Sequence, residues 1–169
     1  EDRVPEVFAP FDYAAWQKEI ADPGMVAINL SLKELSQASF IPHCRSVLEK
    51  HGVSPSRVEL EITETTLMMD AERTLPLLDE LRAMGVHLSI DDFGTGYSSL
   101  SALQQFPIGT LKIDQSFVRN AATDPDDATI VRTIIEMGRS LRLQVLAEGI
   151  ETEEQRQFLL HSGCQFGQG

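Results

Sequence analysis

Short apolar runs alternate with longer segments of helical period along this chain. The apolar runs predict six strands, at Val26–Leu30, Val58–Glu64, His87–Asp92, Thr110–Asp114, Gln144–Glu148 and Cys164–Gln168. The helical segments lie at Phe40–His51, Ala71–Met84, Ser98–Gln105, Asp127–Leu141 and Thr152–Ser162. Repeated strand–helix units predict an α/β fold with parallel strands and right-handed crossovers. Periodicity alone leaves two architectures, a doubly wound sheet and a TIM-type (β/α)8 barrel.

The ends of the predicted helices carry recognisable signals. Thr152 to Gln155 forms a capping-box pattern, and Gly52, Gly85 and Gly163 each follow a helical run. These signals support the predicted element boundaries to within a few residues.

Polar side chains gather toward the carboxyl ends of the predicted strands. They are Asn29, Glu61, Asp91, Asp92, Lys112, Glu148 and Gln168. In a barrel, a strand is apolar until its carboxyl end, where side chains leave the packed interior and can take part in chemistry. This placement favours the barrel over the doubly wound sheet.

The two-residue period of a strand places Glu59 and Glu61 on one face, and Lys112 and Asp114 on one face of a later strand. If the apolar faces meet the helices, these charges point inward, and cations are needed to compensate them. Any single acid, Glu59 or Asp114 above all, could instead cap a helix or face solvent. Carboxylate and amide oxygens suit Mg²⁺ or Mn²⁺, and then Ca²⁺, better than zinc.

Asp91 and Asp92 end a strand side by side, which suits two metal ions bridged by a carboxylate. The glycine-rich segment Phe93–Ser99 follows at once and joins this acidic strand end to a helix. A loop in that place fits a role in ligand gating or in an interface.

The length of 169 residues and the 42% hydrophobic content fit one domain, residues 1–169. The net charge of −12 disfavours DNA or RNA as a partner. Cys44 and Cys164 are expected to be reduced, packed thiols, and the spacing of the four histidines disfavours a zinc site. No apolar run approaches the roughly 20 residues of a membrane span, so we expect a cytoplasmic domain without direct membrane contact.

Six segments together resemble the successive motifs of the EAL-domain family. They are Asn29–Ser31, Glu61–Glu64, Asp91–Ser99, Leu111–Asp114, Ala147–Thr152 and Gly163–Gly169. They occur in the family's order from about Val26 to Gly169, and the stretch that begins Asp91-Asp-Phe-Gly is highly specific.

The resemblance implies a barrel that hydrolyses cyclic di-GMP to the linear dinucleotide pGpG with Mg²⁺ or Mn²⁺, two ions in all, with Ca²⁺ inhibitory or non-productive. It implies a set of metal ligands, namely Asn29, Glu61, Asp91, Asp92 and Glu148. It implies that Lys112 orients or activates the attacking water and that Glu148 is a further carboxylate of the metal site. Gln168 would orient the water or the site through its amide. Glu64 resembles the glutamate that tethers the Asp92–Tyr97 loop, and that loop with its adjacent helix would form a homodimer interface. The substrate-binding residues stay unknown, and the domain could belong to a larger, membrane-tethered signalling protein.

The resemblance is incomplete at both ends. The family's first strand with its Glu-Ala-Leu motif is absent, as is the substrate-binding arginine, and Glu1–Ala21 does not align convincingly with the entry segment. The chain also stops before the closing strand and helix, so about six of eight strand–helix units are expected. Either the chain is a fragment, or residues are left out of it with a join near Glu1–Pro10. We favour the second, because an open barrel would expose its sheet edges.

Three functions remain open from the sequence. The first is the active phosphodiesterase, and the second is an inactive EAL-like receptor or scaffold for cyclic di-GMP. The ligand positions that can be checked are intact, which favours the enzyme. The third is an unrelated barrel enzyme with Lys112 as a Schiff-base nucleophile. Such an enzyme has no need of so many clustered carboxylates.

Overall fold

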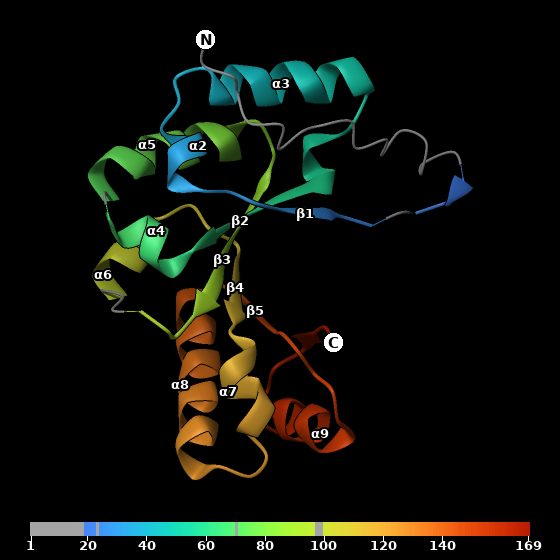
Figure 1. The fold of residues 1–169 in the computed structure, drawn as a ribbon, viewed down its shortest axis with the longest axis vertical. Helices are drawn as coiled ribbons and strands as arrows, with labels where there is room; N and C mark the ends of the chain where they lie inside the picture. The colour runs from blue at the N-terminus through green and yellow to red at the C-terminus, as the bar shows by residue number, and fades with distance from the viewer. Residues whose placement is uncertain (1–18, 23, 70, 97–99) are drawn as a thin grey trace.

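The computed structural model describes residues 19–169 except 23, 70 and 97–99. Its strands are β1 (Val26–Asn29), β2 (Val58–Thr63), β3 (His87–Phe93), β4 (Thr110–Ile113), β5 (Gln144–Ala147) and β6 (Phe166–Gly167). Its helices are α2 (Leu32–Leu35), α3 (Phe40–His51), α4 (Glu64–Met69), α5 (Ala71–Ala83), α6 (Leu100–Leu103), α7 (Gln115–Asn120), α8 (Pro125–Leu141) and α9 (Glu153–His161), with the 3₁₀ turn η2 (Pro55–Arg57). Figure 1 shows these elements along the chain.

The six strands form one sheet in which every neighbouring pair is parallel. Their order in the sheet is their order in the chain, from β1 to β6. A doubly wound sheet reverses its strand order at a switch point, whereas a barrel adds strands in one direction. The sheet is therefore a partial barrel of six strands, which confirms the barrel architecture and the number of units expected from the sequence.

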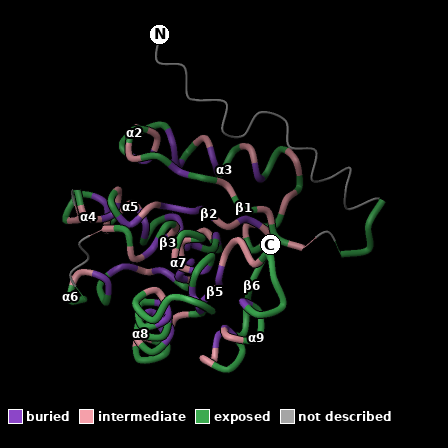
Figure 2. The backbone as a smooth tube through the Cα atoms, turned by 60° about the horizontal axis from the view of Figure 1, so that its bottom comes forward, coloured by how far each residue is buried: buried purple, intermediate pink, exposed green. Residues whose placement is uncertain are grey.

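The core lies on the outer face of the sheet, between the strands and the helices. Leu60 and Ile62 of β2, Ile90 of β3, and Leu111 and Ile113 of β4 are at most 1% exposed. Helices α4, α5 and α8 contact these central strands. Buried backbone follows the middle of the sheet in Figure 2, whereas the edge strand β6 is exposed.

The predicted helix signals occur in the structure. Thr152 forms a capping box with Gln155, and the positive φ angles of Gly52, Gly85 and Gly163 end three helical runs. A left-handed backbone there favours glycine, since a side chain would be strained.

The short helices α2, α4 and α7 were not expected from the sequence. Each has six residues or fewer, which is too short for a helical period to emerge from the apolar pattern. Asp114 caps α7 by accepting a hydrogen bond from the Ser116 backbone, at 2.8 Å. The alternative of a helix cap, left open for Asp114, is thus confirmed.

Some boundaries differ from the prediction. Glu64 begins α4 instead of ending β2, and α8 begins at Pro125 because Asp124 caps it. Helix α6 covers Leu100–Leu103, and the predicted start of this helix at Ser98 lies outside the described residues.

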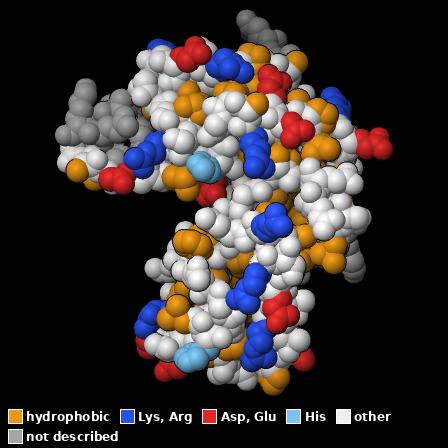
Figure 3. All heavy atoms as spheres, turned by 180° about the vertical axis from the view of Figure 1, so that it is seen from behind, with side chains coloured by type: hydrophobic (Ala, Val, Ile, Leu, Met, Phe, Trp, Pro, Cys, Tyr) orange, Lys and Arg blue, Asp and Glu red, His pale blue; other side chains and the backbone are white. Residues whose placement is uncertain are grey.

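Cys44 and Cys164 are free, buried thiols, as expected. Burial raises the pKa of the Cys44 thiol to about 12, so it stays protonated and unreactive. Acidic and basic side chains are interspersed on the face shown in Figure 3. Within the described part of the chain, no helix combines the length and the apolar character needed to cross a bilayer.

Candidate active site

The ammonium group of Lys112 lies at the centre of a cluster of carboxylates. Its Nζ atom is 2.7 Å from Glu61 Oε1, 2.5 Å from Glu148 Oε1 and 3.6 Å from Asp91 Oδ1. Glu61, Asp91 and Lys112 lie on β2, β3 and β4, and Glu148 directly follows β5. Because these strands are parallel neighbours, their carboxyl ends lie side by side at one edge of the sheet. Lys112 is 4% exposed and Glu61 is 8% exposed, so water screens their contact weakly.

Burial opposes the charge of the Lys112 ammonium, but its hydrogen bonds to Glu148 and Glu61 outweigh that cost and hold its pKa above the ordinary value. The lysine is therefore charged at neutral pH. Since three carboxylates surround one ammonium, negative charge is in excess at this edge.

The sequence led us to expect added cations as the compensating charge for the inward acids. In the structure, Lys112 itself provides part of that charge. Among the residues that the structure describes, no three Asp, Glu, His or Cys side chains are arranged to hold one metal ion. The donor atoms still suit a hard divalent cation, because all of them are carboxylate oxygens.

Asn29 and Gln168 lie at opposite sides of this cluster. Asn29 ends β1, where it is the register partner of Glu61, and it is exposed. Gln168 follows β6, and its Nε2 donates a hydrogen bond of 2.9 Å to Glu148 Oε1. The structure thus places the amide of Gln168 in contact with Glu148, whereas its role in orienting the water or the site stays a prediction.

Asp92 has a left-handed backbone, with φ of 53°, and its carboxyl group interacts with that of Asp114. Although Asp92 is largely exposed, partial desolvation, the interaction with Asp114 and the charges of Asp91, Asp114 and Glu148 together raise its pKa to about 6. Burial also opposes the charge of Asp114, but hydrogen bonds from Ser116 hold its pKa below the ordinary value. Asp92 is therefore the more readily protonated of the two carboxyls, and it takes up a proton as the pH falls toward 6.

The buried carboxylate of Glu64 supports the loop that follows β3. Its Oε2 atom accepts hydrogen bonds from the backbone nitrogens of Gly94, at 2.9 Å, and Gly96, at 3.3 Å. A Cβ atom at Gly96 would lie 3.0 Å from this carboxyl group, so a larger residue would crowd it. Tyr97, the predicted end of the loop, lies outside the described residues.

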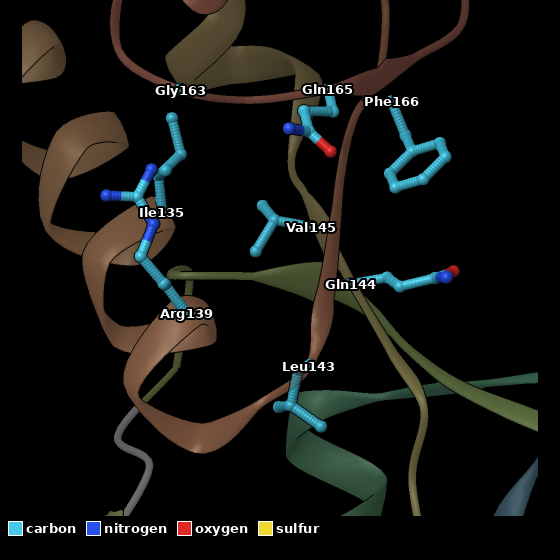
Figure 4. Close-up of a pocket in the computed structure, with 8 residues that line it drawn as sticks. All are labelled: Ile135, Arg139, Leu143, Gln144, Val145, Gly163, Gln165 and Phe166. Carbon is cyan, nitrogen blue, oxygen red and sulfur yellow. The ribbon is translucent and has the colours of Figure 1, made fainter.

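A pocket of about 320 Å³ lies between α8, β5 and the segment that enters β6 (Figure 4). Arg139, Gln144, Val145, Gln165 and Phe166 are among the residues that line it. None of the predicted site residues does so.

Sequence reasoning missed the contact between Asp92 and Asp114. The pattern Asp114-Gln-Ser116 is a helix-start signal that could have placed Asp114 at a strand end, beside the acids.

A family model described as the EAL domain matches residues 6–169. The match begins well before Val26 and includes much of the segment Glu1–Ala21, which corrects our view that this segment does not align with the family. A bifunctional diguanylate cyclase/cyclic di-GMP phosphodiesterase, MucR of Pseudomonas aeruginosa, is 48% identical over 144 residues, 85% of this chain and 21% of that protein.

Two solved structures resemble the fold closely. A MucR phosphodiesterase in complex with c-di-GMP has a TM-score of 0.88 at 44% identity, over 94% of this chain and 64% of that one. A Klebsiella pneumoniae BlrP1 complex with manganese and cyclic di-GMP has a TM-score of 0.85 at 31% identity, over 97% of this chain and 41% of that one. The chain thus spans about a fifth of the length of the curated relative and under two thirds of either solved chain. With a family model that matches nearly all of its length, the chain belongs to the EAL domain family.

Proposed function

We propose that this chain is the catalytic part of a cyclic di-GMP phosphodiesterase that opens the cyclic dinucleotide to linear pGpG with two divalent metal ions. The observation that carries the proposal is the convergence of Glu61, Asp91 and Glu148 on one edge of a partial barrel. The relatives named as phosphodiesterases and crystallised with cyclic di-GMP support the choice of substrate.

The metal ligands would be Asn29, Glu61, Asp91, Asp92 and Glu148. Mg²⁺ or Mn²⁺ suits these oxygen donors, the relative crystallised with manganese agrees with this choice, and Ca²⁺ is expected to bind without supporting turnover. Such ions neutralise phosphodiester oxygens and make a water molecule more acidic. For them to bind, the Lys112 ammonium has to give up part of its contact with the carboxylates.

Three residues of the chain would serve the reaction beside the ligands. Lys112 remains charged, so it would stabilise negative charge and donate a hydrogen bond to the attacking water or to a phosphate oxygen. Gln168 would hold Glu148 in place through its 2.9 Å contact. Glu64 would keep the Asp92–Tyr97 loop in position through its contacts with backbone nitrogens.

We also propose that the Asp92–Tyr97 loop and the adjacent helix α6 contribute to a homodimer interface. Leu100 of α6 and Met69 of α4 are large apolar residues that are 57% and 70% exposed. The single-domain extent of residues 1–169 and the cytoplasmic location stay predictions.

The test is a chromatographic assay of cyclic di-GMP hydrolysis by the complete protein, with Mn²⁺ and with EDTA. We expect pGpG as the product in Mn²⁺ and no product in EDTA. Calcium in place of manganese is the matched control, with binding but little turnover expected. A protein that binds cyclic di-GMP without hydrolysing it in either Mg²⁺ or Mn²⁺ would be the receptor or scaffold instead.

A further inference from the structure

The side chain of Gln155, in the first turn of α9, forms hydrogen bonds with two separate parts of the chain. Its Oε1 atom accepts hydrogen bonds from the backbone nitrogens of Glu151, at 2.8 Å, and Thr152, at 2.9 Å. Its Nε2 atom donates a hydrogen bond of 3.0 Å to the backbone oxygen of Arg119, in the last turn of α7. Gln155 is 5% exposed, so water competes weakly for these bonds. One buried amide thus joins the start of α9 to the end of α7.

A second capping box in the molecule lets local capping be separated from this bridge. In α2, Glu34 Oε2 accepts hydrogen bonds from the backbone nitrogen and the hydroxyl of Ser31. Glutamate and glutamine both serve at this position of a capping box, because only an acceptor oxygen is needed. The Arg119 carbonyl needs a donor, which a glutamine amide has and a glutamate carboxylate lacks. The bridge to α7 therefore gives a reason for glutamine at Gln155 that capping alone does not give.

Helix α7 contacts both ends of the loop formed by residues 148–152. At the first end, a Cβ atom added at Gly149 would lie 2.8 Å from the Cβ atom of Gln115, the first residue of α7. At the second end, Gln155 joins the N-cap of α9 to the last turn of α7. The loop is therefore held against one short helix at two points.

Glu148 is the first residue of this loop and lies just beyond the end of β5. Its carboxylate is 2.5 Å from Lys112 Nζ, within the acidic cluster. One backbone hydrogen bond of 3.3 Å, from its nitrogen to the Ile113 oxygen, links it to β4. The position of the carboxylate therefore depends on the course of the loop as well as on the sheet.

We infer that Gln155 is a positioning residue for Glu148: by joining the loop to α7, it keeps the Glu148 carboxylate beside Lys112 and the proposed metal site. The inference rests on the proposed function, in which Glu148 is a metal ligand. Gln155 touches neither substrate nor metal in this account, so it acts through the loop alone. Residues that support metal ligands in this way change metal affinity or activity by roughly ten- to a hundredfold.

The test is Gln155→Glu, which keeps the acceptor oxygen of the capping box and removes the donor to Arg119. In the complete protein we expect kcat to fall about tenfold, and the Mn²⁺ concentration that gives half-maximal rate to rise about tenfold. Gln157→Glu adds the same charge at an exposed position of α9 and is the matched control, with both quantities within about twofold of the wild type. Gln155→Asn, a neutral and shorter amide, should shift both quantities in the same direction as Gln155→Glu. It serves as the test if the buried charge prevents folding.

A crystal structure of either Gln155 variant grown without metal tests the inference apart from turnover. The 2.5 Å contact between Lys112 Nζ and Glu148 Oε1 should lengthen or break. An unchanged contact would overturn the inference. A lower Tm with wild-type kcat and an unchanged Mn²⁺ requirement would overturn it as well, because Gln155 would then only stabilise α9. A wild-type protein without hydrolysis would instead overturn the proposed function, and the crystal structure would still decide the inference.

Discussion

The two faces of the central strands are both buried, yet they have opposite chemistry. Leu60 and Ile62 of β2 point outward into the helices, while Glu61 between them points inward to Lys112. The outer face gains stability from apolar burial, at roughly 25 cal/mol per Å². The inner face holds charges whose desolvation offsets much of their attraction. The difference indicates that stability and chemistry are carried by alternate residues of the same strands, so each can be changed separately.

The largest expected effect is the loss of activity when an inner-face acid is removed. Glu61→Ala or Asp91→Ala should lower cyclic di-GMP hydrolysis in Mn²⁺ by more than about a hundredfold, because even residues that only support metal ligands cost ten- to a hundredfold. The circular dichroism spectrum should stay close to that of the wild type. Glu154→Ala, on the exposed first turn of α9, is the matched control and should keep full activity. Full activity in either inner-face variant would defeat the metal assignment.

An outer-face change should do the reverse. Leu111 is fully buried, so Leu111→Ala should lower the free energy of unfolding by about 2–5 kcal/mol through lost burial and a cavity. The protein that remains folded should keep its kcat. Denaturant unfolding and an assay at low temperature would measure the two effects, and a variant that stays stable but loses kcat would break the separation of the faces.

Lys112 lies on the inner face but is not a proposed metal ligand, so its removal should affect turnover more than binding. Lys112→Met should lower kcat at least about tenfold, while the Kd for cyclic di-GMP changes less than about threefold. Steady-state kinetics and calorimetric titration with the nucleotide in Ca²⁺ would measure both. Unchanged turnover would remove Lys112 from the mechanism.

The smallest expected effect is a gain in folding stability when the charge of Asp92 is removed. The folded pKa of Asp92, about 6, lies above the ordinary value of 3.8, so its charged form destabilises the fold. The cost is absent below about pH 4, grows between pH 4 and 6, and is fully present above pH 6. Because Asp92 is exposed, screening reduces this cost, and Asp92→Asn in EDTA should stabilise the protein by roughly 1 kcal/mol at pH 7.5.

That gain should shrink toward zero as the pH falls to 4. Thermal unfolding at several pH values would follow it. A gain that is the same at every pH, or a loss at pH 7.5, would show that the Asp92 charge is not strained in the fold.

Much of the fold could be predicted because strand faces follow a simple two-residue period. The six strands, the barrel architecture and the meeting of Glu61, Asp91 and Glu148 at one edge all follow from apolar runs that end in polar residues. The ion pairs of Lys112 could not be predicted. The two-residue period of a strand shows on which face a side chain lies, but not which groups on other strands it contacts. The meeting of Asp92 with Asp114 could not be predicted either, because Asp92 has a left-handed backbone that the sequence does not signal.

If the inner-face carboxylates hold divalent metal ions, diffraction at the manganese absorption edge should locate those ions. A crystal of the complete protein grown with Mn²⁺ should show two anomalous peaks, one beside Glu61 and Asp91 and one beside Asp92. Lys112 Nζ should then have moved away from its 2.5 Å contact with Glu148. An absence of anomalous peaks among these residues at saturating Mn²⁺, with the lysine still held by the carboxylates, would contradict the account.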